Sequence, residues 1–116
     1  MHTKKVGNIG ERYAANYLQK KGYKVIARNF KVKVGEIDII AQDGDTLVLV
    51  EVKTRNNTLY GQPEEAVNTK KIYRIQRAGE YFAQTHRGLP KKQRIEVIAI
   101  QLSGNQVESI KKLTAF

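Results

Sequence analysis

The stretch Gly35–Lys53, GEIDIIAQDGDTLVLVEVK, contains two runs of β-branched and aliphatic residues on either side of Asp43-Gly44. Such runs favour strands, and an Asp-Gly pair supplies the positive φ angles that a tight hairpin turn requires. We therefore predict a β-hairpin with Asp43 and Gly44 as its two turn residues. In that register Asp38 lies opposite Leu49.

One face of this hairpin is expected to concentrate charge. Because side chains alternate between the two faces of a strand, a single face should carry Glu36, Asp38, Glu51 and Lys53. The predicted register places Glu36 opposite Glu51 and makes Asp38 a diagonal neighbour of Glu51, with Cβ atoms roughly 7 Å apart. Like charges so close destabilise a strand pair, so a cation must neutralise them.

The residue types on this face match phosphodiester hydrolysis. Hard carboxylate oxygens suit Mg²⁺ or Mn²⁺, and we expect Asp38, Glu51 and the Val52 carbonyl to coordinate one of these cofactors. A bound metal polarises a phosphoryl oxygen and acidifies water, and Lys53 would position that water or stabilise developing charge. The alternative is a simple cross-strand charge pair on a solvated edge. Glu51-Val52-Lys53 alone favours that alternative, whereas Asp38 on the same face favours the hydrolytic site.

Composition restricts the class of partner. The chain has 116 residues with 21 Lys and Arg against 11 Asp and Glu, a net charge of +10, which favours a polyanion such as DNA or another nucleic acid. This length predicts a single domain over residues 1–116. The absence of cysteine excludes disulfides and thiolate metal sites. No apolar run suggests a signal peptide or a membrane span, so a cytoplasmic protein without membrane partners is expected.

A first helix is predicted from about Ile9 to Lys21. Asn8 can cap it, and Gly22 suits the left-handed position after its last turn. Glu11 then has two readings: it closes a capping box with Asn8, or it reaches over the hairpin as a third carboxylate of the metal site. Spacing alone favours the capping role.

The remaining segments predict an α/β fold. Residues 24–32 and 94–101 read as strands, a last short strand follows near residues 107–112, and a helix capped by Asn68 runs to about Thr85 with a buried stripe of Ile72, Ile75, Ala78, Gly79 and Phe82. We expect a central mixed sheet of about five strands with a β-meander core, flanked by helices. Glu96, at the start of a strand, is expected to pair with a lysine or arginine rather than to join the acidic site.

Two segments offer nucleic-acid contacts. Arg55 and Tyr60 follow the strand that bears Glu51 and could grip a phosphate or stack on a base; the alternative is a plain surface loop. The second helix carries a basic face made of Lys70, Lys71, Arg74 and Arg77. No acidic residue falls between Glu65 and Glu80, so these charges are expected to lack partners within the helix.

Several motifs together resemble the YraN-like family of uncharacterised bacterial proteins. They are GEIDIIA and VEVKTR in the hairpin, AVN with Lys70, the early G-x-x-G-E at Gly7 to Glu11, and Arg28-Asn29-Phe30. The family is similar to archaeal Holliday junction resolvases within the PD-(D/E)xK nuclease superfamily. The resemblance implies a restriction-endonuclease-like fold, with Asp38, Glu51 and Lys53 as the metal and catalytic set and Glu11 contributing from the first helix.

Two positions depart from the superfamily pattern. The name-giving proline-aspartate is Ile37-Asp38 here, and a later aspartate is replaced by the longer Glu96. The first departure is common among relatives of the superfamily, whereas the second leaves a catalytic role for Glu96 open.

The leading hypothesis is therefore a Mg²⁺- or Mn²⁺-dependent endonuclease acting on DNA, with structured or branched DNA as one candidate substrate. The alternatives are a nucleic-acid-binding module that keeps the scaffold without turnover, and a protein-interaction subunit. A two-fold homodimer would suit a duplex or junction target.

Overall fold

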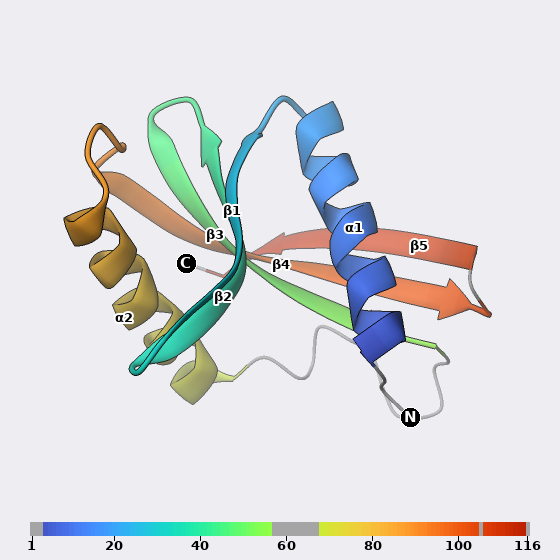
Figure 1. The fold of residues 1–116 in the computed structure, drawn as a ribbon. Helices are drawn as coiled ribbons and strands as arrows, with labels where there is room; N and C mark the ends of the chain where they lie inside the picture. The colour runs from blue at the N-terminus through green and yellow to red at the C-terminus, as the bar shows by residue number, and fades with distance from the viewer. Residues whose placement is uncertain (1–3, 57–67, 105, 116) are drawn as a thin grey trace.

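The described part of the chain forms two helices and five strands. The structure, a computed structural model, describes residues 4–56, 68–104 and 106–115 (Figure 1). In chain order the elements are α1 (Lys4–Lys20), β1 (Lys24–Val32), β2 (Gly35–Asp43), β3 (Thr46–Arg55), α2 (Thr69–Thr85), β4 (Lys92–Ser103) and β5 (Gln106–Thr114). Neither described helix has the length and apolar character needed to cross a membrane.

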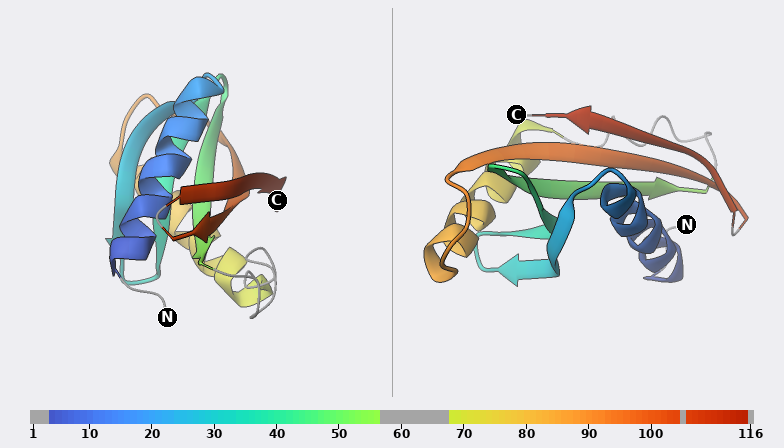
Figure 2. Two further views of the ribbon diagram at one scale, coloured as in Figure 1. Left: turned by 90° about the vertical axis from the view of Figure 1, so that its right-hand side faces the viewer. Right: turned by 90° about the horizontal axis from the view of Figure 1, so that it is seen from above.

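The strands form one mixed sheet in the order β1-β2-β3-β4-β5. β1, β2 and β3 make an antiparallel meander, β3 and β4 are parallel, and β5 pairs antiparallel with β4. The parallel pair requires a crossover, and α2 lies within it. The predicted α/β fold, a mixed sheet with a meander core and flanking helices, is confirmed (Figure 2).

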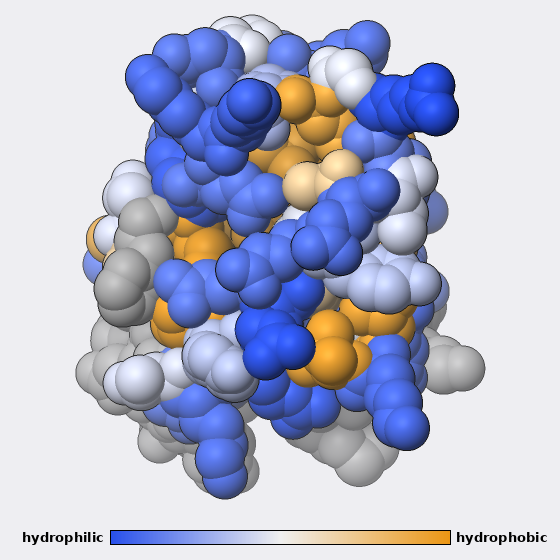
Figure 3. Space-filling view, turned by 90° about the vertical axis from the view of Figure 1, so that its left-hand side faces the viewer, coloured by the Kyte–Doolittle hydropathy of each residue, from blue (hydrophilic) through white to orange (hydrophobic). Residues whose placement is uncertain are grey.

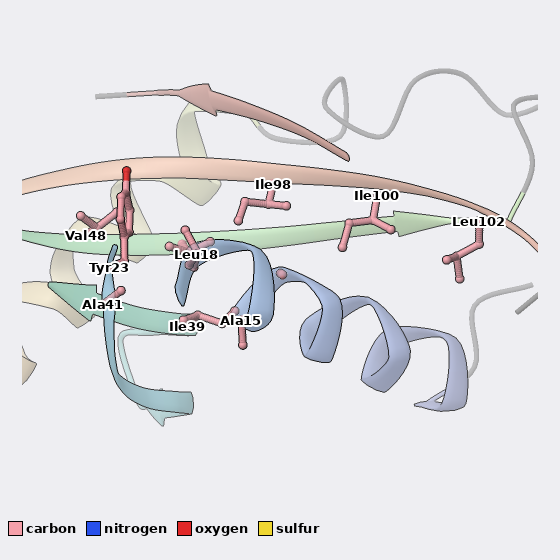
Figure 4. Close-up of a cluster of buried hydrophobic side chains, with 11 residues drawn as sticks. Ala15, Leu18, Tyr23, Ile39, Ala41, Val48, Ile98, Ile100 and Leu102 are labelled. Carbon is pink, nitrogen blue, oxygen red and sulfur yellow. The ribbon is translucent and has the colours of Figure 1, made fainter. Parts of the chain in front are cut away.

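Each face of the sheet has its own hydrophobic core. On the α1 face, Ala14 and Leu18 pack against strand residues such as Ile39, Val50 and Ile98 (Figure 4). On the α2 face, the helix contributes Ile72, Ile75, Ala78 and Phe82, and the sheet contributes Ile40, Leu47, Leu49 and Ile95. Because both faces are covered, the central strands are apolar on both sides, and a polar side chain buried in them needs a specific partner.

The hairpin forms, but its predicted register is wrong. The turn residues are Gly44 and Asp45, with Asp43 paired to Thr46 and Ile40 paired to Leu49. Gly44 has φ +58° while Asp45 has a negative φ, the pattern of a turn that takes glycine at its first central position. Glycine therefore starts the turn rather than ending it.

This correction brings the two key carboxylates closer together. The last printed pair of the ladder is Ile39 with Val50, and continuing it places Asp38 directly opposite Glu51 rather than on a diagonal. The shift amounts to two residues, so every side chain stays on its predicted face.

The second helix matches its prediction, whereas the first begins earlier. α2 is capped by Asn68, whose side chain accepts from the Lys71 amide at 2.9 Å, and it buries the predicted stripe. α1 begins at Lys4, so Asn8 lies inside the helix and the predicted capping box with Glu11 is wrong. Its C-terminus is as expected: Gly22 has φ +92°, and the Tyr23 amide donates to the Leu18 carbonyl at 3.0 Å.

Two glycines let the helices approach the sheet closely. A Cβ atom on Gly10 would lie 1.9 Å from Thr54 Oγ1, so α1 rests directly on β3. A Cβ atom on Gly35 would lie 2.4 Å from the Arg74 carbonyl oxygen, so the start of β2 rests on α2. The first contact explains why α1 stays helical through residues of poor helix propensity. Together they fix both helices beside the charged end of the hairpin.

An ionic network ties together the end of the sheet near the hairpin turn. Glu96 is 1% exposed, and its Oε2 accepts from Arg94 Nε at 2.8 Å and from the Tyr23 hydroxyl at 3.0 Å. Arg94 also donates to Asp43 Oδ2 at 2.6 Å, and Lys112 Nζ donates to the Tyr23 hydroxyl at 2.8 Å. Glu96 thus pairs with basic side chains, and the network as a whole joins β2, β4 and β5 to Tyr23, the residue before β1.

Replacing Glu96 with glutamine should destabilise the fold. The change leaves Arg94 and Lys112 without their buried counter-charge, and we expect a loss of about 2 to 3 kcal/mol in the free energy of unfolding because Arg94 keeps some contact with solvent. Urea unfolding of Glu96→Gln beside Glu108→Gln, whose parent side chain is exposed, measures this. Equal stability of the two variants would show that the network contributes nothing.

Candidate metal centre

The charged side chains of the hairpin line a hollow of about 250 Å³ between the two helices, here called the acidic hollow. Residues from four elements, α1, β2, β3 and α2, meet there. The lining is Glu11, Glu36, Asp38, Glu51, Val52, Lys53, Thr54, Arg55 and Lys71. Every residue predicted as catalytic or metal-binding is among them. The acidic hollow also contains Lys71, which was predicted only as a phosphate contact.

The half-buried Asp38 and the buried Glu51 form the centre of the acidic hollow. Asp38 Oδ2 accepts from the backbone amide of Val52 at 2.8 Å, which holds its carboxyl group against β3. Glu51 is 6% exposed. The two carboxyl groups are close enough for each to shift the pKa of the other, in opposite directions.

The environment drives the pKa values of these two groups apart. Burial raises the pKa of Asp38 to about 8, and the adjacent Glu51 carboxylate adds to the shift. Burial would also raise the pKa of Glu51, but the hydrogen bond from Asp38 and the Lys71 ammonium hold it below its usual value. Asp38 is therefore the acid of the pair at neutral pH and Glu51 the carboxylate.

Lys71 extends from the first turn of α2 into the acidic hollow. Its Nζ lies 2.8 Å from Glu51 Oε2, in an ion pair whose angles fall short of a hydrogen bond. Burial would lower the pKa of Lys71, but Glu51 outweighs that effect and raises it. Glu51 Oε2 is thus a buried oxygen with a charge partner but no hydrogen-bond donor.

Lys53 lies beside the same group. It is half-buried, and burial lowers its pKa, with the nearby Lys71 and Arg55 charges acting in the same direction against the pull of Glu51. Two ammonium groups therefore share one carboxylate pair. Lys71 carries the direct contact with Glu51, and Lys53 is the ammonium that is easier to deprotonate.

Glu11 enters the acidic hollow from α1 but is held by β1. Its Oε1 lies 3.8 Å from Arg28 Nη2. With the Asn29 amide assigned so that its nitrogen faces Glu11, that nitrogen donates to Oε1 at 2.8 Å. Burial raises the pKa of Glu11, and the charges of Glu51 and Glu36 act in the same direction. Glu11 is therefore within electrostatic reach of the pair, while its contacts are with Arg28 and Asn29.

The donor set fits a hard divalent cation at two carboxylates. Asp38 and Glu51 supply oxygens side by side, and the buried Glu51 Oε2 accepts no hydrogen bond. Within residues 4–56, 68–104 and 106–115, no group of three or more His, Cys, Asp or Glu side chains gathers closely enough to hold a metal ion. The expected third carboxylate, Glu11, is thus not assembled with the other two.

The basic side chains of α2 differ in their surroundings and in their partners. Lys70 and Arg74 are exposed and, with Glu36, Asn68, Lys71 and Ile75, line a second hollow of about 270 Å³, here called the basic hollow. Arg77 donates to the Tyr73 hydroxyl at 2.9 Å and lies 3.6 Å from Glu80. The expectation that these charges lack partners within the helix is therefore wrong for Arg77, which pairs with Glu80 of the same helix. The partner of Lys71 is Glu51 of β3.

The outward surface on the α2 side is mainly hydrophilic and interrupted by apolar patches (Figure 3). Arg55 is at the end of β3 and lines the acidic hollow. Tyr60, the other predicted contact from this region, lies outside the described residues. Among the described residues, the cationic side chains that line the acidic hollow are Lys53 and Arg55 of β3 and Lys71 of α2.

Sequence reasoning missed two contributors to the site. Lys71 was assigned to the outer face of its helix, although its position in the first turn, one residue before the buried Ile72, places it at the boundary of the stripe. Asn29 has φ +54° inside β1, a conformation that asparagine tolerates better than most residues. An asparagine within a strand pattern was the signal available for it.

Relatives of this chain share its length and much of its sequence. Residues 10–100 match the uncharacterised protein family UPF0102. A UPF0102 protein of Dictyoglomus thermophilum is 43% identical over 103 residues, covering 89% of this chain and 87% of the relative. Another, from Caldicellulosiruptor bescii, is 43% identical over 112 residues, covering 95% and 94%. The chain therefore belongs to the uncharacterised protein family UPF0102, and the predicted YraN-like membership is confirmed.

Proposed function

We propose that this protein is a divalent-metal-dependent endonuclease that hydrolyses DNA phosphodiesters. The observation that carries the proposal is the adjacent pair of the buried Glu51 and the half-buried Asp38, flanked by two lysines at an open hollow. A fold gains nothing from burying two carboxyl groups against each other. Their placement is understandable if they serve a cation and an anionic substrate.

Each side chain has a role in this proposal. Asp38 and Glu51 would hold Mg²⁺ or Mn²⁺ together with the Val52 carbonyl, and Glu11 would assist from α1. The cation supplies a Lewis acid for the scissile phosphate and a water of lowered pKa. Lys53, half-buried and with a lowered pKa, would orient the attacking water and accept or return its proton. The Val52 amide keeps Asp38 in place throughout.

The substrate assignment rests on charge and position. The net charge of +10 favours a polyanion. Lys70 and Arg74 lie beside the acidic hollow in the basic hollow, where they could hold phosphates on one side of the scissile bond. Arg55 would do the same from the end of β3. These contacts are to the backbone, so they favour DNA without selecting a base sequence.

Removal of the carboxylate or the lysine should abolish cleavage. With Mn²⁺ and a panel of linear, single-stranded, flapped and four-way DNAs, we expect Asp38→Asn and Lys53→Ala each to lower the cleavage rate by at least about 100-fold. EDTA should abolish cleavage by the unmodified chain. Asp45→Asn and Lys91→Ala are matched controls, since both parent side chains are exposed, and they should cleave normally.

Unfolding must be separated from loss of chemistry. Asp38→Asn removes a buried acid that Glu51 opposes, so it should be at least as stable as the unmodified chain at pH 8 in thermal unfolding. Unchanged cleavage in both site variants would refute the assignment. DNA binding without any metal-dependent product, in every variant and in the unmodified chain, would instead indicate a nucleic-acid-binding module.

Metal affinity should depend on pH through Asp38. Its raised pKa of about 8 means that below pH 8 a cation must displace a proton, whereas above pH 8 it need not. The association constant for Mn²⁺ should thus rise by about tenfold per pH unit up to pH 8 and then level off. Isothermal titration between pH 6 and 8.5 measures this. A constant affinity across that range would show that no Asp38 proton is displaced.

A further inference from the structure

Lys71 is placed to do more than bind a phosphate. It lines both the acidic hollow and the basic hollow. Its backbone is fixed, because its amide donates to the Asn68 side chain at the start of α2. Its ammonium, at the end of a flexible four-carbon chain, is not fixed in the same way. The ammonium can therefore pass between the two hollows without any movement of the helix.

In the structure the Lys71 ammonium lies in the acidic hollow. Lys71 Nζ lies 2.8 Å from Glu51 Oε2, the oxygen that has no hydrogen-bond partner. The Lys71 ammonium is thus the counter-charge in direct contact with the Glu51 carboxylate. The oxygen that is best suited to a cation from solution is thus already in contact with a cation of the protein.

A divalent ion and this ammonium cannot share that oxygen. Two positive centres in contact with one carboxylate oxygen would repel each other strongly inside a half-buried hollow. The half-buried Lys53 adds a third positive charge at the same place. Binding of the ion must therefore move the Lys71 ammonium.

The displaced Lys71 ammonium can move into the basic hollow. That hollow is bounded by Glu36 and by the exposed Lys70 and Arg74, so an ammonium entering it gains a nearby carboxylate and adds to two existing phosphate-binding charges. We propose that Lys71 and a divalent cation are alternative partners of Glu51, and that metal binding transfers the Lys71 ammonium to the basic hollow, where it strengthens phosphate binding. Lys71 is then a positioning residue that couples metal loading to DNA binding.

The inference rests on the proposed function only in requiring that the Asp38–Glu51 pair binds a divalent ion. Its first test is the dissociation constant for Mn²⁺ alone, measured by isothermal titration at pH 7.5. Lys71→Met removes the competing charge and keeps the length of the side chain, so it should bind Mn²⁺ at least tenfold more tightly than the unmodified chain. Lys70→Met, one position away and outside the acidic hollow, should change the affinity by less than threefold.

The possible results separate the two proposals. Equal or weaker Mn²⁺ binding by Lys71→Met, with binding by the unmodified chain intact, overturns the role of Lys71 alone. Failure of all three proteins to bind Mn²⁺ overturns the metal site and the inference together. If Lys71→Met is unstable, Lys71→Gln provides the same comparison, because it also lacks the charge.

A second measurement tests the transfer to the basic hollow. Binding of a short DNA duplex is followed by fluorescence anisotropy at constant ionic strength, with Ca²⁺ in place of the catalytic ion. In the unmodified chain Ca²⁺ should lower the dissociation constant for DNA by at least threefold more than it does in Lys71→Met. An equal effect of Ca²⁺ in the two proteins would overturn the coupling.

Discussion

The burial of Asp38 against Glu51 is the constraint on which the rest of the site depends. Asp38 and Glu51 cannot both be fully charged side by side in a half-buried hollow. Their repulsion is offset by the raised pKa of Asp38, by the Lys71 ammonium and by the Val52 amide. The proton stays on Asp38, the ammonium comes from α2, and the amide comes from β3. These contacts require α2 and β3 to be held in fixed positions beside Asp38 and Glu51.

The fold meets those requirements through close contacts rather than through the site itself. Gly10 allows α1 to rest on Thr54, and Gly35 allows β2 to rest on the backbone of α2 at Arg74. The first contact brings Glu11 to the acidic hollow, and the second brings Lys71. The ionic network around Glu96 then holds the opposite end of the same strands. The geometry of the site is thus set by the close contacts of the helices with the sheet and by the ionic network at the other end of the strands.

Much of this architecture could be predicted from local patterns. The buried stripe of α2, its Asn68 cap, β1 and the left-handed Gly22 all follow from periodicity or capping preferences, which act over a few residues. The start of α1 could not, because contact with β3 outweighs the weak helix propensity around Asn8. The hairpin register was also wrong, since the glycine of Asp43-Gly44-Asp45 takes the first turn position, with Asp45 beside it.

The candidate site likewise combines residues that local sequence patterns predict with residues that they do not. The hairpin pattern alone was enough to group Asp38, Glu51 and Lys53, because alternation survives a register shift of two residues. The position of Lys71 was not accessible in this way. Its contact with Glu51 joins a helix to a strand, and the helical period places it only near the edge of the buried stripe. The same holds for Glu11, whose partners Arg28 and Asn29 belong to another strand.

The left-handed Asn29 has an effect beyond the acidic hollow. β1 is an outer strand of the sheet, and such strands offer unpaired backbone groups to other chains. Here the strand is interrupted by an irregularity between Val25 and Ala27 and by the reversed φ of Asn29, and it carries exposed Lys24, Arg28 and Lys31. The residues that hold Glu11 thus also make this border a poor template for intermolecular strand addition, which protects the protein against aggregation along it.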